Sequence, residues 1–441
     1  MSSLESPPAG TELAGLPAET VVPYFTQPEL LRTVAEANEA YWYWTELRRR
    51  VPAGADARLL WQVARQQRRQ TAWHLTLGND SFTFNLPRRL QQALVELDGH
   101  LGGERAAAAG LLGGQERNHL LVNARMEEAI ASSQMEGAST TREVAKELLR
   151  VRRKPLNLSE RMIVNNYRAM RHLYELRSQP LTPTLLLELQ ELVTKGTLDN
   201  SAYAGRLRDH DRIAVVDHVA SEAVYQPPAA AALPHLLSQF CQLANDETKA
   251  TWHPLVKAAV LHFLLGYIHP FVDGNGRTAR TIFYWYLLRR NYTLVEYLPI
   301  SRIIKRSVGQ YARAYLHAEN DSNDLTYFIS YQLKVLQQGY QELAAYAARQ
   351  QQQAAASREL LLTGQLNERQ ITLLQRLREK PTTILAIRDY EQQFGVVYQT
   401  ARTDLMGLEE LGLLEKKRIG KQKLLYFRAE DFDQQLAKLK G

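Results

Sequence analysis

The sequence is almost without cysteine: only Cys241 occurs among its 441 residues. An intramolecular disulfide is therefore excluded, and we expect Cys241, in a stretch of helical pattern, to be a buried structural thiol. No run of about 18 apolar residues occurs, so no membrane-spanning helix and no membrane partner are expected. The first residues, MSSLESPPAG, lack the basic start and the apolar core of a signal peptide. We expect a soluble, cytoplasmic chain.

A strong excess of one charge is also missing. The formal net charge is +7, which is mild for this length. Such a charge permits a nucleic acid or a nucleotide as partner but requires neither. Apolar residues make up 45% of the chain, which suffices for packed cores, and the length predicts two or three domains.

Helical periodicity dominates what is present and predicts a mainly α fold with few strands. Turn residues at Gly78-Asn79-Asp80 and alternating β-branched residues at 212–226 indicate two short hairpins, and 102–114 is expected to be a flexible connection. The expected parts are a flexible arm (1–22), an N-terminal helical region (23–114), a helical central domain (115–345), a helical linker (346–365) and a small C-terminal domain (366–441).

The segment from His269 to Arg280, HPFVDGNGRTAR, is the most informative. A helical stretch leads into His269 and is ended by Pro270. Two glycines flank Asn275, so backbone N–H groups can converge there without obstruction by a Cβ. A second helix is expected to begin near Arg277. A glycine-rich turn that leads into a helix N-terminus is a phosphate-binding arrangement.

The charged residues of this segment support the same interpretation. Arg277 and Arg280 lie three residues apart and share one face of the helix's first turn, where the helix dipole disfavours cations. A triphosphate between them would make this arrangement favourable. Asp273 is placed to hold Mg²⁺ on phosphate oxygens, and His269 can accept a proton near neutral pH.

At every specified position this segment matches the signature of the Fic family, His-x-Phe-x-Asp/Glu-Gly-Asn-Gly-Arg-x-x-Arg, and the chain resembles that family over about 115–345. The resemblance implies a helical Fic core that transfers AMP from ATP to a Ser, Thr or Tyr hydroxyl of a target protein and releases pyrophosphate. It implies that His269 is the catalytic base, that Phe271 anchors the loop, and that Asp273 binds Mg²⁺.

The resemblance also implies which residues bind the nucleotide. Arg277 would reach the β-phosphate and Arg280 the γ-phosphate. The hairpin at 212–226 resembles the family's flap, which pins the target segment, and Tyr311 resembles an aromatic position beside the adenine. A purely structural hairpin is left open. The implied nucleotide-binding residues are Asp273, Gly274, Asn275, Gly276, Arg277, Thr278, Ala279, Arg280, Val215, Val216, Asp217, His218 and Tyr311.

A second pattern, Ser132-Ser-Gln-Met-Glu136-Gly137, resembles the family's inhibitory motif, Ser/Thr-x-x-x-Glu-Gly/Asn. Glu136 lies at a predicted helix C-terminus, where the dipole disfavours an anion, so it needs a cationic partner. The resemblance supplies Arg280 as this partner, which would deny ATP its productive pose. A helix end with a glycine cap is the alternative, and removal of AMP through a water aligned by Glu136 is left open.

The C-terminal domain is predicted to contain three helices and a basic hairpin, and it resembles a winged helix. The lysines and arginine of the hairpin suit DNA phosphates, but Asp404, Glu409 and Glu410 on the preceding helix do not. Over 361–441 there are 14 Lys and Arg against 11 Asp and Glu. Contact with DNA and contact with a protein, including a homodimer partner, are both left open.

Two functions are consistent with these patterns. The first is an autoinhibited protein adenylyltransferase that uses ATP and Mg²⁺ and modifies a target protein, with self-modification left open. The alternative is a nucleotide-sensing, DNA-binding regulator. A sensor has no need of a base, so the intact His269 favours the enzyme. Transfer of another phosphate-containing group is less consistent with Arg277 and Arg280.

Overall fold

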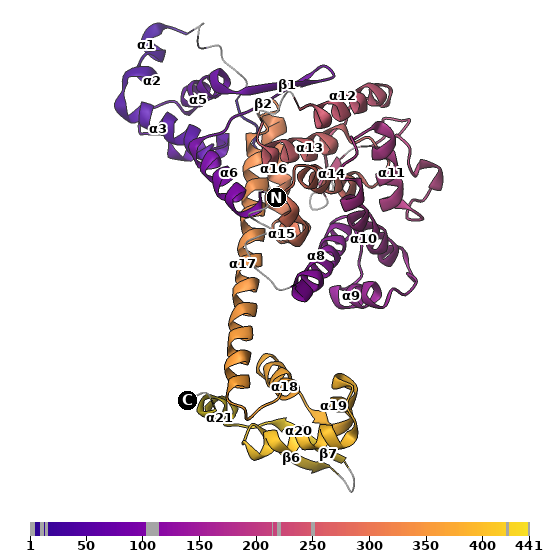
Figure 1. Ribbon diagram of the computed structural model, residues 1–441. Coiled ribbons are helices and arrows are strands. Elements are labelled where there is room, and N and C mark those ends of the chain that lie inside the picture. The colour runs from indigo at the N-terminus through magenta and orange to yellow at the C-terminus, as the bar shows by residue number, and fades with distance from the viewer. Residues whose placement is uncertain are drawn as a thin grey trace. The chain divides into compact units, whose positions relative to one another are not determined.

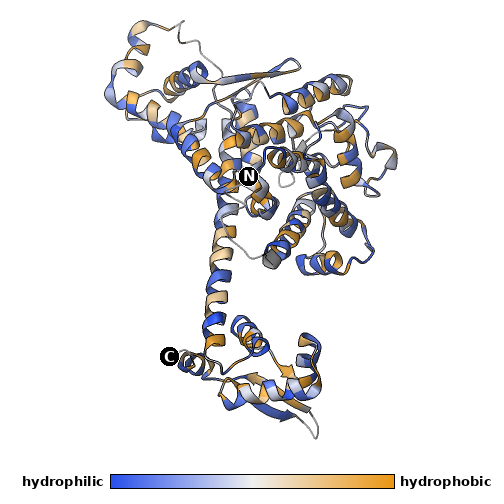
Figure 2. Cartoon of the chain, viewed as in Figure 1, coloured by the Kyte–Doolittle hydropathy of each residue, from blue (hydrophilic) through white to orange (hydrophobic). Residues whose placement is uncertain are grey.

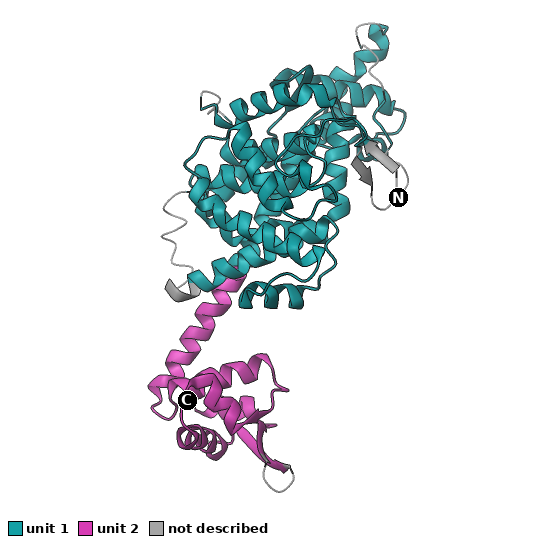
Figure 3. Ribbon diagram, turned by 90° about the vertical axis from the view of Figure 1, so that its right-hand side faces the viewer, with its two compact units in different colours: residues 1–343 teal, residues 344–441 magenta. Residues whose placement is uncertain are grey.

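The computed structural model describes residues 5–8, 13, 16–102, 114–213, 215–217, 222–247, 252–419 and 423–439. These residues confirm the mainly α fold. Two compact units, residues 1–343 and 344–441, are coloured separately in Figure 3. Within the described ranges no helix is long and apolar enough to cross a membrane.

The N-terminal region is helical with one hairpin, which has the turn expected at Gly78–Asp80. The expected loose arm is anchored where it is described, because Glu5 accepts a hydrogen bond from Trp44 Nε1 at 2.9 Å and pairs with Arg48 at 2.7 Å. The elements are α1 (Ala18–Val21), α2 (Pro23–Thr26), α3 (Pro28–Ala40), α4 (Trp44–Leu47), η2 (Arg48–Arg50), α5 (Ala57–Thr71), β1 (Trp73–Leu77), β2 (Asp80–Phe84) and α6 (Arg88–Leu101).

The rest of the first unit is a set of helices interrupted by one antiparallel hairpin, β3–β4, within the expected 212–226. We call this hairpin the flap. The elements are α8 (Gly114–Met135), α9 (Arg142–Val151), α10 (Leu158–Leu176), α11 (Pro183–Thr194), η3 (Ser201–Tyr203), β3 (Val215–Asp217), β4 (Glu222–Tyr225), η4 (Ala230–Ala232), α12 (Leu233–Asn245), α13 (Pro254–Ile268), α14 (Asn275–Arg289), η5 (Thr293–Tyr297), α15 (Ile300–Arg306), α16 (Val308–Asn320) and α17 (Thr326–Leu362).

Helices α13 and α14 lie at the centre of this unit (Figure 1). Every residue from Leu255 to Leu265 is buried, and Figure 2 shows α13 in apolar colours over most of its length. Helices α10 and α11 pack on α14, α12 packs on α13, and α8 packs on α10 and α15. The loop that joins α13 to α14 is therefore carried by a rigid, close-packed helix pair.

The second unit contains the three helices and the hairpin expected from the sequence, and also a short strand and a last helix that were not expected. Its identification as a winged helix stays a prediction. The elements are the second half of α17, α18 (Glu368–Glu379), β5 (Leu385–Ala386), α19 (Ile387–Phe394), α20 (Tyr398–Glu410), β6 (Leu414–Ile419), β7 (Lys423–Arg428) and α21 (Phe432–Lys438), with strand order β5-β7-β6.

One expectation for α20 is wrong. Asp404 does not face outward but is 5% exposed, and its Oδ2 accepts hydrogen bonds from Arg369 Nε at 2.8 Å and from Tyr390 OH at 3.0 Å. Glu409 pairs with Lys416 at 2.7 Å. A buried carboxylate requires such partners, so Asp404 is a polar centre of this unit's core.

The two connections expected from composition differ in outcome. The segment 102–114 lies outside the described residues except at its two ends. The segment 346–365 is helical as far as Leu362, because α17 extends that far without interruption.

Candidate active site

The loop from His269 to Gly274 joins the two central helices by two residues in the left-handed region. His269 ends α13 with φ 47° and ψ 57°, and its N–H donates to Leu265 O at 3.1 Å. Gly274 precedes α14 with φ 86°. Helix α14 begins at Asn275, two residues before the expected start near Arg277.

Asn275 and Phe271 close this loop internally. Asn275 Oδ1 accepts from Phe271 N at 3.0 Å, and its Nδ2 donates to Phe271 O at 2.8 Å. The Phe271 side chain is fully buried in the core. The side chain of Asn275 therefore shapes the loop, which leaves its backbone N–H for an anion.

The N-terminus of α14 is a set of converging donors. The first bond within this stretch runs from Thr278 N to Gly274 O at 2.9 Å, so the N–H groups of residues 275–277 precede it. They lie at the positive end of the helix dipole, where a phosphate is favoured. Thr278 and Ala279 are buried, so their side chains face the core.

Arg277 points into the protein. Its fully buried guanidinium donates to Val193 O at 3.0 Å and pairs with Asp273 Oδ2 at 2.9 Å. This contact differs from the β-phosphate contact implied by the family resemblance. Arg277 here joins the loop to α11 and orients the Asp273 carboxylate.

Asp273 is the candidate magnesium ligand. Its side chain is 46% exposed, and its Oδ1 accepts from Gly274 N at 2.5 Å. No group of three or more His, Cys, Asp or Glu that could hold a metal is found in the described part of the chain. Mg²⁺ is commonly held by one or two carboxylates together with substrate phosphates and water, so this single half-exposed carboxylate fits an ion that arrives with a nucleotide.

His269 is held as a neutral base. Its Nδ1 lies 3.3 Å from Gly266 O, and an N–H donated there leaves Nε2 as the proton acceptor. Burial lowers the pKa of His269 below its ordinary value, and the Arg208 cation lowers it further; the Gly266 bond and the Glu136 and Asp273 carboxylates oppose this but do not reverse it. The imidazole can therefore accept a proton at neutral pH.

The end of α8 brings a carboxylate to this site. Glu136 directly follows the helix, and Gly137 after it is left-handed. Glu136 Oε1 lies 2.8 Å from Arg280 Nη2. Ser132, one turn earlier, accepts from Arg280 Nε at its hydroxyl (2.8 Å) and from Nη2 at its carbonyl (3.1 Å). Two residues of the expected inhibitory motif, Ser132 and Glu136, thus contact one guanidinium.

The Glu136 carboxylate lies against the backbone at the start of α14. A Cβ at Gly276 would overlap this carboxylate. Burial raises the pKa of Glu136, but Arg280, Arg277 and His269 more than offset this and leave the pKa below its ordinary value. A charged carboxylate therefore lies beside the N–H donors that a phosphate would use.

The other residues expected to bind the nucleotide belong to the flap and to α16. Val215, Val216 and Asp217 form β3 of the flap, and His218 lies outside the described residues. Tyr311 OH lies 3.0 Å from Nε2 of the buried His262. Burial raises the pKa of this hydroxyl, and the nearby charges of Arg280 and Glu136 also act on it. The adenine contact of Tyr311 stays a prediction.

Sequence reasoning missed Arg208, a buried arginine whose Nε donates to His269 O at 2.9 Å. No local pattern in Gly205-Arg-Leu-Arg208 indicates this contact, which joins residues 61 positions apart. The general expectation that arginine is exposed points away from it.

Comparison with known proteins adds a family. Residues 180–287 match the model of the Fic/DOC family. The protein adenylyltransferase Fic of Drosophila melanogaster is 44% identical over 66 residues, which cover 15% of this chain and 13% of that protein. The matched stretch thus spans a small part of this curated relative.

Two solved structures share the fold. A Fic family protein from Desulfovibrio desulfuricans G20 has a TM-score of 0.50 at 21% identity and covers 77% of this chain and 96% of its own. Fic-1 from C. elegans has a TM-score of 0.50 at 18% identity, with 74% and 90% covered. At these identities the likeness shows the fold.

Proposed function

With residues 180–287 identified as a Fic domain, we propose that this chain transfers AMP from ATP to a hydroxyl of a target protein and restrains itself through Glu136. The carrying observation is the juxtaposition of a neutral His269, the anion-binding N-terminus of α14, and a carboxylate that occupies Arg280. The protein adenylyltransferases among the matched relatives support AMP as the transferred group.

In the proposed reaction His269 Nε2 removes the proton from the target hydroxyl as its oxygen attacks the α-phosphorus of ATP. A new P–O bond joins AMP to the protein, the bond to the β-phosphate breaks, and pyrophosphate leaves with the electron pair. The N–H groups at the start of α14 hold the phosphates and stabilise the developing negative charge. The rigid α13–α14 pair supplies the positioning on which such transfers depend.

Asp273 would hold Mg²⁺ when the nucleotide binds. Bound there, the ion would offset negative charge on the phosphates. Arg277 contributes by orienting the Asp273 carboxylate, which keeps it at the rim of the phosphate site.

Glu136 restrains the reaction by occupying both the guanidinium and the space that a terminal phosphate needs. ATP must displace this carboxylate from Arg280 before its γ-phosphate can bind there. The resulting competition is between two anions for one buried cation, so Glu136 inhibits by weakening ATP binding in the productive pose and not by contacting His269.

The alternative, a nucleotide-sensing DNA-binding regulator, gains no support from the family matches. The partner is a protein that offers a Ser, Thr or Tyr hydroxyl, and the chain itself is a convenient first acceptor.

We predict that the native chain transfers little label from α-labelled ATP with Mg²⁺, that Glu136→Gly transfers at least about tenfold more, and that Glu136→Gly with His269→Ala transfers none. The measurement is label fixed on the chain or on added proteins. Equal labelling by the first two forms would remove Glu136 as the brake. An absence of label in all forms, despite ATP binding, would contradict AMP transfer.

A further inference from the structure

Arg208 carries a cation that the structure buries completely. Its side chain is 0% exposed, and a buried cation is unfavourable unless its donors are satisfied. Nε donates to His269 O at 2.9 Å, Nη1 donates to His210 O at 3.0 Å and to Asp211 Oδ1 at 3.2 Å, and Nη2 donates to Pro228 O. Every nitrogen of the guanidinium therefore has an acceptor.

These acceptors belong to two parts of the site. His269 O lies in the loop between α13 and α14, and the backbone N–H of Arg208 donates to Pro270 O at 3.0 Å, in the same loop. Asp211 precedes β3 and Pro228 follows β4, so they lie at the two ends of the flap, where the chain enters and leaves the hairpin. Arg208 therefore joins the loop that carries His269 to both ends of the flap.

The contact with His269 has a conformational consequence. A left-handed backbone is sparsely populated for a residue with a Cβ and persists only where surrounding contacts hold it. The Arg208 hydrogen bond to His269 O favours this orientation of the peptide group. In this conformation the imidazole Nδ1 lies 3.3 Å from Gly266 O.

We propose that Arg208 is a positioning residue, which holds His269 in a fixed relation to the flap and so to the hydroxyl presented there. The inference rests on the proposed AMP transfer for its effect on rate. It rests on the structure alone for its effect on the loop. Arg208 would not touch the reacting atoms.

Arg208 also acts on His269 through its charge. Its cation disfavours the imidazolium form and is one of the groups that lower the pKa of His269 after burial. The effect of the guanidinium hydrogen bonds, here called the fork, can therefore be separated by substitution from the effect of the positive charge. Arg208→Lys keeps the charge but loses the fork, and Arg208→Gln loses both.

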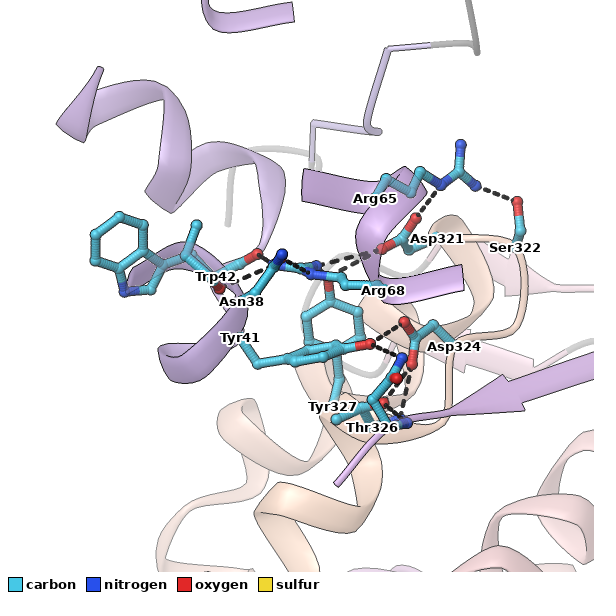
Figure 4. A network of polar contacts seen from close by, with 12 residues as sticks. Asn38, Tyr41, Trp42, Arg65, Arg68, Asp321, Ser322, Asp324, Thr326 and Tyr327 are labelled. Atoms are coloured by element: carbon cyan, nitrogen blue, oxygen red, sulfur yellow. Dashed lines mark hydrogen bonds and ion pairs between the residues drawn. The ribbon is translucent and has the colours of Figure 1, made fainter. Parts of the chain in front are cut away.

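The variants are best compared in the Glu136→Gly full chain. Arg68→Lys is the matched control, because Arg68 is also buried and donates to two carbonyls, those of Ala37 (3.0 Å) and Trp42 (2.9 Å). Figure 4 shows its network, which joins the N-terminal region to residues 321–327 and includes neither the loop after α13 nor the flap. Asp211→Asn is a milder variant, since its side chain is 60% exposed and Arg208 keeps its bonds to His269, His210 and Pro228.

We expect Arg208→Lys to lower the self-labelling rate at least about tenfold while the dissociation constant for ATP changes less than about threefold. Asp211→Asn should lower the rate about threefold, and Arg68→Lys should lower only the melting temperature. Amide exchange at 268–276 should accelerate in Arg208→Lys and not in Arg68→Lys. The NMR titration midpoint of His269 should rise in Arg208→Gln and stay in place in Arg208→Lys.

A loss of rate in Arg208→Lys no greater than in Arg68→Lys, or unchanged exchange at 268–276, would overturn the inference. If the Glu136→Gly parent does not label at all, the proposed function has failed. The exchange and titration measurements then still decide whether Arg208 holds the loop.

Discussion

At the scale of single residues, Glu136 and Arg280 relieve two unfavourable arrangements with one contact. Glu136 follows the C-terminus of α8, where the dipole disfavours an anion, and the Arg280 cation is only 2% exposed, which is unfavourable without an acceptor. Their 2.8 Å pair compensates both. ATP can offer Arg280 the same compensation, but Glu136 loses its partner when ATP binds, so displacement of the carboxylate costs free energy and the pair opposes ATP binding.

The pKa of His269 sets how the transfer rate of the Glu136→Gly variant depends on pH. Burial lowers this pKa, and the Glu136 carboxylate is one of the groups that raise it. Glu136→Gly should therefore lower it further, so kcat/KM should rise with pH through a midpoint below 6.5, the ordinary value of histidine. Transfer rates from about pH 5 to about pH 8.5 measure this midpoint. A midpoint above 6.5 would contradict the neutral-base assignment.

At the scale of elements, α8 is held to α14 and α15 by hydrogen bonds of Glu128, two turns before its last residue. Glu128 is 2% exposed, and its carboxylate accepts from Ser301 N at 2.8 Å, from Tyr284 OH at 2.9 Å and from Ser301 Oγ. These partners lie on α14 and at the start of α15. Lifting the whole of α8 would expose all of them, so Glu136 is more readily freed by a change in the last turn.

Glu128→Ala tests this fastening. It leaves the two Ser301 donors without their acceptor, while Tyr284 OH keeps Leu298 O at 2.6 Å. The free energy of unfolding should therefore fall by about 2–4 kcal/mol, and self-labelling of the otherwise native chain should rise because α8 is held less firmly. Urea unfolding and labelling measure the two effects. Glu147→Ala, an exposed carboxylate on α9, should change neither. Lost stability without increased labelling would separate α8 anchoring from the brake.

Local sequence patterns predicted the elements that depend on local rules. Pro270, Gly274 and Gly276 specify the turn between two helices, and the inhibitory motif ends a helix at Gly137, so these features were visible without tertiary information. The roles of Arg208 and Asp404 were not visible. Each depends on burial of an ionised side chain by segments distant in sequence, against the usual preference for exposure. The buried position of Arg277 was missed for the same reason.

At the scale of the whole molecule, the two units have separate apolar cores. The second core surrounds Asp404, whose carboxylate joins α20 to α18 through Arg369 and to α19 through Tyr390. Separate cores unfold as separate cooperative units when few contacts join them.

We therefore predict two thermal transitions, of which Asp404→Asn lowers only the one that belongs to residues 344–441. The expected loss is about 2–4 kcal/mol, because Arg369 and Tyr390 lose a charged acceptor. Calorimetry of the full chain measures both transitions. Glu410→Gln, exposed on the same helix, is the control. A single transition, or a shift of both, would contradict independent units.

The contact between Glu136 and Gly276 limits which alleles can be hyperactive. A side chain at 276 would push the carboxylate away, but it would also stand beside the N–H groups that we propose hold the phosphates, so we expect such a substitution to relieve the inhibition and abolish transfer together. Only changes on the α8 side separate the two outcomes. In a genetic selection the helix end is thus the route to gain of function, and the glycine turn yields only loss.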